Sequence, residues 1–585
     1  MNIFKTIEAK LLAAISAAQQ SGELPDPLDL AGVEVQEPRD PSHGDVALNA
    51  ALVLAKRAQR KPRDIAEALA ARLRDDPDIA AVDIAGPGFL NVRLADSVWT
   101  ELIASIHAAG NRFGHSDAGT GTRVQVEYVS ANPTGPMHVG HCRGAVFGDA
   151  LANLLAAVGH EVTREYYVND AGAQVDKLGQ STILRYREAL GQDIGEIPEG
   201  LYPGDYLRPV GAALAETHGN ALLDKPEAEQ TAIGRDAAIA AMLDEIKTDL
   251  ASLGVIHDVF FSERSLAEGT TDEVTAAIDA LRSKGLIYEG HLPRPKGHDE
   301  ESWEDREQLL FKSTEFGDDM DRALAKSDGG YTYFANDVAY HYNKLQRGFD
   351  LYFNVLGADH IGYVPRLKAV VTALADRDVQ FETPICNLVK VVRNGEPVRM
   401  SKRAGTFVAL ADVVEEVGRD PVRFMMLMNK SDTPIDFDLG KVVEQSKDNP
   451  VFYVQYAYAR LASVFRNAPE TFPGLTRDAL SGSTIDLSAL TEPGERDLLR
   501  LMSRYPRLIA TAAREREPHR ITRYLYDLAS ALHAQWAQGN DSPHLRFLVA
   551  GDERLTKARL QLVLAVQQTL ASGLDILGVS APERM

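Results

Sequence analysis

The sequence predicts an α/β protein: a doubly wound parallel sheet with an insertion, preceded by a small α/β domain and followed by an all-helical domain. Its 585 residues are enough for about three or four domains. Val124, Val126 and Tyr128 alternate as in a strand, and a loop, a helix and a second strand follow. Such units build parallel sheets. After about residue 447 helical signals are many and strand signals few.

The first domain is expected to cover residues 1–115. Apolar periodicity predicts helices over 2–20, 46–58 and 62–74, and Pro62 suits the first turn of the last of these. Alternating apolar residues on both sides of Gly86-Pro87-Gly88 then predict a strand, a turn and a second strand.

The second domain is expected to cover residues 116–446. Its first strand leads through a Pro- and Gly-rich loop into a helix from about His138, and residues 161–168 read as the next strand. The interval of about 175–325 is acidic and helix-like, which predicts an insertion. Strand-like segments return at 351–356 and 387–392. Residues 447–585 form the helical third domain, with a long apolar-periodic helix over 560–577.

Composition excludes several classes of protein. Apolar residues make up 45% and charged residues 25%, as expected for a chain with a large buried core, and there is no run of eighteen apolar residues to span a membrane. The two cysteines cannot form a disulfide framework or a four-thiolate zinc site, which favours a reducing, cytoplasmic compartment. The net charge of −22 argues against a protein that coats nucleic acid non-specifically. Nearly all basic residues after 447 are arginines, which suit phosphate binding but also occur as ordinary helix-surface charge.

The loop after the first strand carries the first chemical motif. Residues 128–141 run Tyr-Val-Ser-Ala-Asn-Pro-Thr-Gly-Pro-Met-His-Val-Gly-His and end at the start of the helix. A helix N-terminus favours phosphate, and His138 and His141 can donate hydrogen bonds to it. Gly140 leaves room for a nucleotide base near the backbone. An ordinary helix start with a capping histidine would give the same short pattern.

The second motif is Val398-Arg-Met-Ser-Lys-Arg403, which follows a predicted turn at 393–396. Three cations in five positions on a loop can stabilise charge that develops on a triphosphate. Basic surface loops are common, so this motif is weak by itself. Both motifs in this order on a parallel-sheet scaffold are far more specific.

Together the two motifs resemble the HIGH and KMSKS signatures of class I aminoacyl-tRNA synthetases. The stretch from Glu127 to His141 is similar to that of the arginyl-tRNA synthetases in particular. Further matching stretches cover essentially the whole length: 43–49, 202–206, 331–337, 357–360 and 577–585. The resemblance implies a Rossmann-like catalytic domain at 116–446, an N-terminal domain that touches the tRNA elbow at 1–115, and a helical anticodon-binding domain at 447–585. It implies formation of arginyl-adenylate from L-arginine and ATP, and transfer to the terminal adenosine of tRNA(Arg).

The resemblance also implies the residues of the arginine pocket, which are Glu127, Ser130, Asn132, Tyr333, Asp337 and His360. A guanidinium needs carboxylate acceptors in fork geometry, which Glu127 and Asp337 would supply as two negative charges. Lysine offers the same charge but no fork, so selectivity would follow from geometry.

For ATP, the resemblance implies binding by His138, Gly140, His141, Gly357, Asp359, Met400, Ser401 and Lys402. Catalysis would rest on His138, His141 and Lys402, with no covalent enzyme intermediate. The first lysine of the second signature is Arg399 here, and the loop at 131–137 holds no lysine that could replace it. Arg399 is therefore the expected substitute. Mg²⁺ would accompany ATP as part of the substrate complex, and no tightly bound metal is expected.

Two sets of residues are expected to contact tRNA: Lys56, Arg57, Arg60 and Lys61 in the first domain, and Tyr453, Gln455, Tyr456 and Arg460 in the third. A solvated loop would explain the first set equally well, and core packing would explain part of the second. By the same resemblance, arginine activation requires bound tRNA and the protein is a cytoplasmic monomer with no membrane partner.

Three alternatives stay open on the sequence. A class I synthetase for another amino acid would share the fold, although a cysteine-specific one needs zinc ligands that two cysteines without close pairing do not offer. An RNA-binding relative without activity would lose its nucleotide motifs, which are present here. A nucleotidyltransferase acting on a small molecule would leave residues 447–585 without a role.

Overall fold

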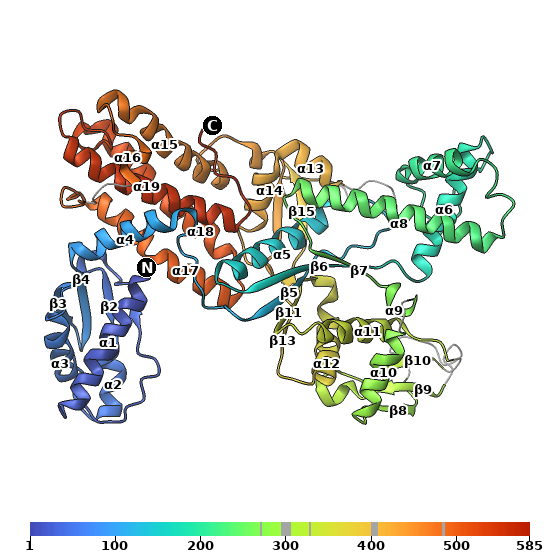
Figure 1. The fold of residues 1–585 in the computed structure, drawn as a ribbon, viewed down its shortest axis with the longest axis horizontal. Coiled ribbons are helices and arrows are strands. Elements are labelled where there is room, and N and C mark those ends of the chain that lie inside the picture. Colours follow the sequence, from blue (N-terminus) through green and yellow to red (C-terminus); the bar gives the residue numbers. More distant parts are fainter. Residues whose placement is uncertain (269–271, 294–305, 327–328, 399–407, 482–485) are drawn as a thin grey trace. The chain divides into compact units, whose positions relative to one another are not determined.

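The computed structural model describes residues 1–268, 272–293, 306–326, 329–398, 408–481 and 486–585 (Figure 1). Four predicted site residues, Arg399, Met400, Ser401 and Lys402, lie outside these ranges. The chain forms two compact units. One comprises Asp117–Glu444, and the other joins Met1–Ser116 with Gln445–Met585. No helix within the described ranges is both long and apolar enough to cross a membrane.

The N-terminal part packs helices on a four-stranded antiparallel sheet of order β1-β2-β4-β3. Its elements are α1 (Ile3–Gln20), β1 (Val35–Gln36), β2 (Val46–Leu48), α2 (Ala50–Ala58), α3 (Pro62–Arg74), β3 (Ile79–Ala85), β4 (Phe89–Leu94) and α4 (Asp96–Ala109). The expected helix over 46–58 is wrong at its start. Residues 46–48 pair with β4, and Val46 and Leu48 are buried while Ala47 between them is less so. These residues therefore form a strand, and the helix begins only at Ala50.

The C-terminal part is helical, as predicted, with α15 (Pro450–Thr471), α16 (Arg477–Ser481), α17 (Pro493–Glu515), α18 (His519–Asp541) and α19 (Glu553–Ile576). One face of α17 carries arginines at helical spacing, and each contacts the N-terminal part of the same unit: Arg496 with Asp96, Arg500 with Asp45, Arg504 with Glu37, and Arg507 with the carbonyl of Val35. These arginines, which could have been a basic surface for RNA, instead hold two parts of the chain together.

The unit of Asp117–Glu444 is built on a five-stranded sheet of order β13-β11-β5-β6-β7 in which every pair is parallel. Its strands are β5 (Arg123–Glu127), β6 (Glu161–Val168), β7 (Val259–Ser262), β11 (Leu351–Asn354) and β13 (Gln380–Glu382). The chain runs outward from β5 through β6 to β7 and then returns to β11 on the other side. This confirms the doubly wound sheet and places a switch point between β5 and β11, where such folds bind ligands beyond the carboxyl ends of the strands.

The interval of 175–325 is not one continuous insertion, because β7 inside it is a strand of the central sheet. Before β7 lie the helices α6 (Ala173–Ala189), α7 (Arg208–His218) and α8 (Glu227–Ser252). After it come α9 (Ser265–Glu268), α10 (Glu273–Ser283) and a separate antiparallel sheet of β8 (Ile287–Gly290), β9 (Gln308–Phe311) and β10 (Arg322–Ala325). The acidic run at 299–305 lies outside the described residues.

Helix α11 (Tyr333–Gln346) precedes β11 in the chain, and helix α12 (Val364–Leu374) follows it. Between β11 and α12, the short strand β12 (Leu356–Gly357) pairs with β14 (Ile385–Cys386). A buried apolar cluster joins α10, α11, α12 and the small sheet, including Ile278, Phe311, Val338 and Val370. It fixes the position of α11 against the central sheet.

The end of the unit carries β15 (Val389–Arg393), β16 (Glu396–Pro397), α13 (Leu410–Val417), α14 (Arg419–Met426) and β17 (Ile435–Asp438). The predicted turn at 393–396 is the connection between β15 and β16. The carboxylate of Asp438 accepts hydrogen bonds from the backbone N–H groups of Asn394 and Gly395 and so closes this turn.

Candidate active site

The chain leaves β5 through a strained bend that places the first site residues. Val129 and Ser130 have φ angles of 71° and 43°, which β-branched and polar residues rarely adopt. The Ser130 hydroxyl compensates for this strain. It lies 3.2 Å from Glu127 Oε1, to which it donates, and accepts the backbone N–H of Tyr167 at 3.1 Å. The bend is thereby fixed to both β5 and β6.

Three polar residues lie in one row across the sheet. The parallel register aligns Glu127 of β5 with Glu165 of β6 on one side and with Asn354 of β11 on the other. All three side chains are buried. Because aligned residues on neighbouring strands project from the same face, two carboxylates are adjacent in a dry environment and need compensating cations.

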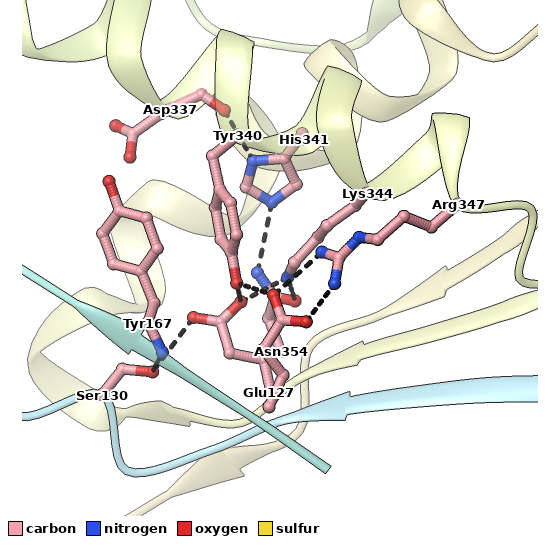
Figure 2. A network of polar contacts seen from close by, with 10 residues as sticks. Glu127, Ser130, Tyr167, Asp337, Tyr340, His341, Lys344, Arg347 and Asn354 are labelled. Carbon is pink, nitrogen blue, oxygen red and sulfur yellow. Dashed lines mark hydrogen bonds and ion pairs between the residues drawn. The ribbon is translucent and has the colours of Figure 1, made fainter. Parts of the chain in front are cut away.

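Helix α11 provides these cations (Figure 2). Lys344 pairs with Glu127, and Arg347 pairs with Glu165. Tyr340, one turn before Lys344, lies 2.7 Å from Glu165 Oε1 and 3.1 Å from Glu127 Oε2. Although burial opposes it, the hydrogen bond from Arg347 together with nearby cations keeps the pKa of Glu165 below its ordinary value. The row therefore holds two carboxylates and two cations.

A chain of hydrogen bonds ties this row to the backbone of α11 (Figure 2). The amide of Asn354 accepts from Lys344 Nζ at 2.8 Å and donates to His341 Nε2 at 3.2 Å. His341 Nδ1 in turn donates to the carbonyl of Asp337 at 2.8 Å. Burial and the charge of Lys344 lower the pKa of His341 to about 3, so its imidazole stays neutral with the proton on Nδ1.

Asp337 differs from the two glutamates because no cation pairs with it among the described residues. Its carboxylate accepts a hydrogen bond from the Tyr363 hydroxyl. Burial raises its pKa to about 7. The Tyr363 hydrogen bond and the charge of Arg366, which lies over the Tyr363 ring, oppose this rise, and the charges of Glu263 and Glu127 add to it. A half-buried carboxylate with this environment gains most from a cation that arrives with a ligand.

The other predicted arginine-site residues lie on the same elements but make different contacts. Tyr333 begins α11, its side chain is 75% exposed, and the absence of a Cβ on Gly172 leaves room for its ring. Asn132 accepts from Asn169 at 2.7 Å and donates to Gln174 at 3.3 Å. His360 is exposed three residues before Tyr363, and its Nε2 lies 3.4 Å from the Asp359 carboxylate.

The two histidines of the first motif cap the helix α5 (Val139–Ala157) in a reciprocal manner. His138 Nδ1 accepts the backbone N–H of Gly140 at 3.1 Å, and His141 Nδ1 accepts the backbone N–H of His138 at 3.3 Å. Their rings stack with centroids 3.9 Å apart. Because each Nδ1 accepts, the neutral imidazoles carry their protons on Nε2, and the Nε2 atom of His138 is buried.

The segment that follows the second motif is joined to the first motif. The Val139 N–H donates to the Val408 carbonyl at 3.2 Å, and the Leu410 N–H donates to the Met137 carbonyl at 3.0 Å. His138 and Ala409 thus form an antiparallel bridge. Residues 408–410, which follow the second motif in the sequence, therefore lie against the helix start that contains His138.

At two glycines predicted to contact ATP, a side chain would require a neighbouring side chain to move. A Cβ on Gly140 would lie 2.7 Å from the ring of His138, so glycine here makes room for the capping histidine. A Cβ on Gly357 would lie 2.4 Å from the Asp359 carboxylate, whose side chain is otherwise 75% exposed.

Several residues of the site were not expected from the sequence. They are Glu165, Glu263, Tyr340, His341, Lys344, Arg347, Asn354 and Tyr363. Glu263 follows β7 and accepts from Asn336 at 2.8 Å, and burial raises its pKa. The spacing of Tyr340, Lys344 and Arg347 by four and three residues, on one face of α11, was the signal that could have identified the three contacts to the row.

The predicted tRNA contacts are divided between exposed and occupied side chains. Lys56 and Lys61 are exposed, whereas Arg57 donates to the carbonyls of Asp29 and Ala31, and Arg60 to that of Glu23. In the C-terminal part, Gln455 is buried and donates to the Ser580 carbonyl. Arg460 lies over the rings of Tyr456 and Trp536, at 4.4 and 5.0 Å from their centroids, and Tyr453 packs on His533.

Comparison with known proteins finds three family models along the chain. They are the arginyl-tRNA synthetase N-terminal domain at residues 5–94, the class I (R) tRNA synthetase catalytic domain at 103–190, and the DALR anticodon-binding domain at 454–585. Arginine–tRNA ligases of Methylobacterium nodulans and of Methylobacterium sp. strain 4-46 are 58% and 59% identical, each over 100% of both chains. The arginyl-tRNA synthetase structure from Thermus thermophilus has a TM-score of 0.72 at 22% identity, over 100% of both chains.

Proposed function

The chain belongs to the arginyl-tRNA synthetase family and has its arginine–tRNA ligase activity, and we propose that Asp337 and the two motif histidines are central to that reaction. L-Arginine is activated by ATP to arginyl-adenylate, with release of pyrophosphate, and the arginyl group then passes to the terminal adenosine of tRNA(Arg). The observation that carries the proposal is the difference between Asp337, which has no paired cation in the described residues, and the paired Glu127 and Glu165.

Arginine binds with its guanidinium at Asp337, between Tyr333 at the start of α11 and the row of the sheet. Glu127 and Ser130 form the inner wall, and Ser130 is fixed by both strands. Asn132 and His360 would contact the α-amino and carboxylate groups, which must lie towards the motif histidines for the carboxylate to attack the α-phosphate in line. Positioning of this kind supplies a large part of the rate enhancement in such reactions.

ATP binds at the N-terminus of α5, where His138 and His141 would donate to phosphoryl oxygens and Gly140 gives room to the ring of His138. Asp359, after Gly357, would hold the ribose hydroxyls. Met400, Ser401 and Lys402 follow from the sequence motif, with Lys402 stabilising the transition-state charge and Arg399 in place of the usual first lysine. Class I synthetases use ATP with Mg²⁺, and here the metal enters with the nucleotide as substrate.

tRNA(Arg) would contact the unit that joins the N- and C-terminal parts. Lys56 and Lys61 remain exposed for the elbow, next to Arg57 and Arg60, and the stack of Arg460 on Tyr456 presents an aromatic and cationic surface near Tyr453. Gln455 is buried and donates to the Ser580 carbonyl, so it would affect tRNA binding only by holding the C-terminal segment in place. The protein would work as a monomer in the cytoplasm.

ATP–pyrophosphate exchange tests the reaction and its tRNA dependence. We expect exchange with arginine alone among the amino acids, and only when tRNA(Arg) is present. Exchange with another amino acid would keep the class of enzyme and overturn the assignment of Asp337 to a guanidinium. Absence of exchange under all conditions would favour an RNA-binding relative without activity.

A pH profile should report the ionisation of Asp337. Arginine stays cationic throughout, so it binds the carboxylate form, and below the pKa of about 7 a proton must first leave. The kcat/KM for arginine should therefore fall about tenfold per pH unit below 7 and level off above it. The measurement is initial-rate exchange between pH 5.5 and 8.5. In an Asp337→Asn variant kcat/KM should no longer fall below pH 7. A wild-type profile that is flat from pH 6 to 8 would contradict the assignment of this ionisation to Asp337.

Lys402→Ala should lower kcat at least about a hundredfold while ATP affinity falls far less, because the side chain acts on charge that develops only in the transition state. Single-turnover adenylate formation and nucleotide binding by equilibrium dialysis separate the two effects. Equal losses in both would assign Lys402 to ground-state binding. Arg403→Ala, one residue further along the loop, is the matched control and should lose much less.

A further inference from the structure

The row of Glu127, Glu165 and Asn354 contains two carboxylates that could attract the cationic substrate away from Asp337. Glu127 is next to the strained bend with Ser130, and its charge, like that of Glu263, acts on both Tyr167 and Asp337. If Glu127 carried an uncompensated charge, it would compete with Asp337 for the substrate guanidinium. The structure removes this competition with a cation of its own.

That cation is Lys344, which is only 1% exposed and has three kinds of contact. Its ammonium pairs with Glu127, donates to Asn354 Oδ1 at 2.8 Å, and lies 4.4 Å from the ring centroid of Tyr340 (Figure 2). Such an ammonium, surrounded on three sides by β5, β11 and its own helix, cannot be replaced by solvent. A second cation, Arg347, does not substitute for it, because both of its terminal nitrogens contact Glu165.

We propose that Lys344 is a positioning residue of arginine activation: its buried ammonium neutralises Glu127, and thereby directs the substrate guanidinium to Asp337. This inference rests on the proposed assignment of the arginine pocket. It assigns Lys344 no contact with arginine or ATP. It explains why a site that selects a cationic substrate contains a buried lysine paired with Glu127.

The groups that face Glu127 and Lys344 determine the sign of the expected effects. From the bend after β5 it is Ser130, from β6 they are Glu165 and Tyr167, from β11 Asn354 and Tyr352, and from α11 Tyr340, His341 and Arg347. Asp337, whose ionisation sets the pH midpoint, faces Glu263 after β7, Tyr363 before α12 and Arg366 of α12. His341 remains neutral because burial lowers its pKa to about 3. Removing Lys344 therefore leaves one carboxylate charge in the row without a partner, and Asp337 experiences that charge.

Lys344→Met keeps the length of the side chain and removes the charge. We expect kcat in the arginine-dependent exchange to fall at least about tenfold while the arginine KM changes less than about threefold, since a cation is still attracted but is held away from the attacking geometry. The midpoint of the pH profile for kcat/KM should also move upward by at least about half a pH unit, because the unscreened charge of Glu127 makes Asp337 harder to ionise.

Two further variants separate positioning from packing. Lys344→Arg retains the charge and should keep the wild-type pH midpoint even if packing lowers kcat. The double variant Glu127→Gln/Lys344→Met removes both charges, should fold even if Lys344→Met alone does not, and should return the midpoint towards the wild-type value. Lys284→Met is the matched control, because this lysine of the same unit contacts only Asp376 and the carbonyls of residues 373–375 in the described structure.

The outcomes distinguish this inference from the proposed function. If wild-type protein does not exchange with arginine, the proposed function itself is wrong. If it does, but Lys344→Met keeps the wild-type kcat and pH midpoint, the inference about Lys344 is wrong and the proposed function stands. An unmoved midpoint in both Lys344→Met and the double variant, with equal losses of kcat in Lys344→Met and Lys344→Arg, would reduce Lys344 to a packing residue.

Discussion

Asp337→Asn should raise the arginine KM by about a hundredfold or more in ATP–pyrophosphate exchange. The asparagine keeps the shape and still offers an oxygen to the Tyr363 hydroxyl, but it leaves a buried guanidinium without its carboxylate. Truncating one partner of a buried charge pair costs about 2–5 kcal/mol, or roughly thirty to several thousandfold in affinity. The effect should be large because Glu127 and Glu165 already have their own cations and cannot take over.

The ATP KM should change little in the same variant, since Asp337 belongs to the arginine side of the site. Asp350→Asn is a suitable control. This aspartate also lies in the catalytic unit, but its half-exposed carboxylate already pairs with Arg377 and accepts the backbone N–H of Arg123. An arginine KM within threefold of wild type in Asp337→Asn would show that the guanidinium binds elsewhere.

Two substitutions of His141 should separate its structural role from its role towards ATP. Asparagine places an acceptor near the position of Nδ1 and can still cap the backbone N–H of His138, but it has no donor at Nε2. Glutamine places an amide donor near Nε2 and gives up the cap. If the Nε2–H donates to a phosphoryl oxygen in the transition state, His141→Asn should lower kcat about 10²–10³-fold with nearly unchanged stability.

His141→Gln should instead keep more of kcat and lose about 1 kcal/mol of unfolding free energy, the usual cost of a helix cap. Single-turnover adenylate formation and thermal or urea unfolding measure the two quantities. The opposite order, with Asn more active than Gln, would mean that the histidine acts through the helix cap and not through the phosphate.

The parts of this site that depend on local pattern could be predicted from the sequence. Strict alternation at 124–128 and the apolar face of the following helix predict β5 and α5, and the motif residues Glu127 and Asp337 lie close enough for the charge of Glu127 to act on Asp337. The charge balance could not be predicted. Lys344 and Arg347 are 217 and 182 residues away from their partners in sequence, and only the parallel register of β5 and β6 makes the two glutamates neighbours.

Contacts between residues distant in sequence also explain why the predictions for β7, for residues 46–48 and for the arginines of α17 were wrong. β7 is a strand of four residues within a long helical interval, and only its pairing with β6 shows that the central sheet continues there. Residues 46–48 lie directly before a helix and share its apolar character, so their pairing with β4 was invisible to periodicity. The arginines of α17 give a basic pattern in the sequence, and tertiary contacts with the N-terminal part use that charge within the molecule.

The number of protons released when arginine binds tests most directly whether Asp337 receives the guanidinium. Because arginine binds the ionised form of Asp337, whose pKa is about 7, titration calorimetry at pH 7 in buffers of different ionisation enthalpy should show about half a proton released per arginine bound. The measurement should be made with and without tRNA(Arg), and Asp337→Asn should release none at the arginine concentrations that it needs. Zero release by the wild-type protein, or the same release by Asp337→Asn, would contradict the claim that Asp337 is the carboxylate that receives the substrate guanidinium.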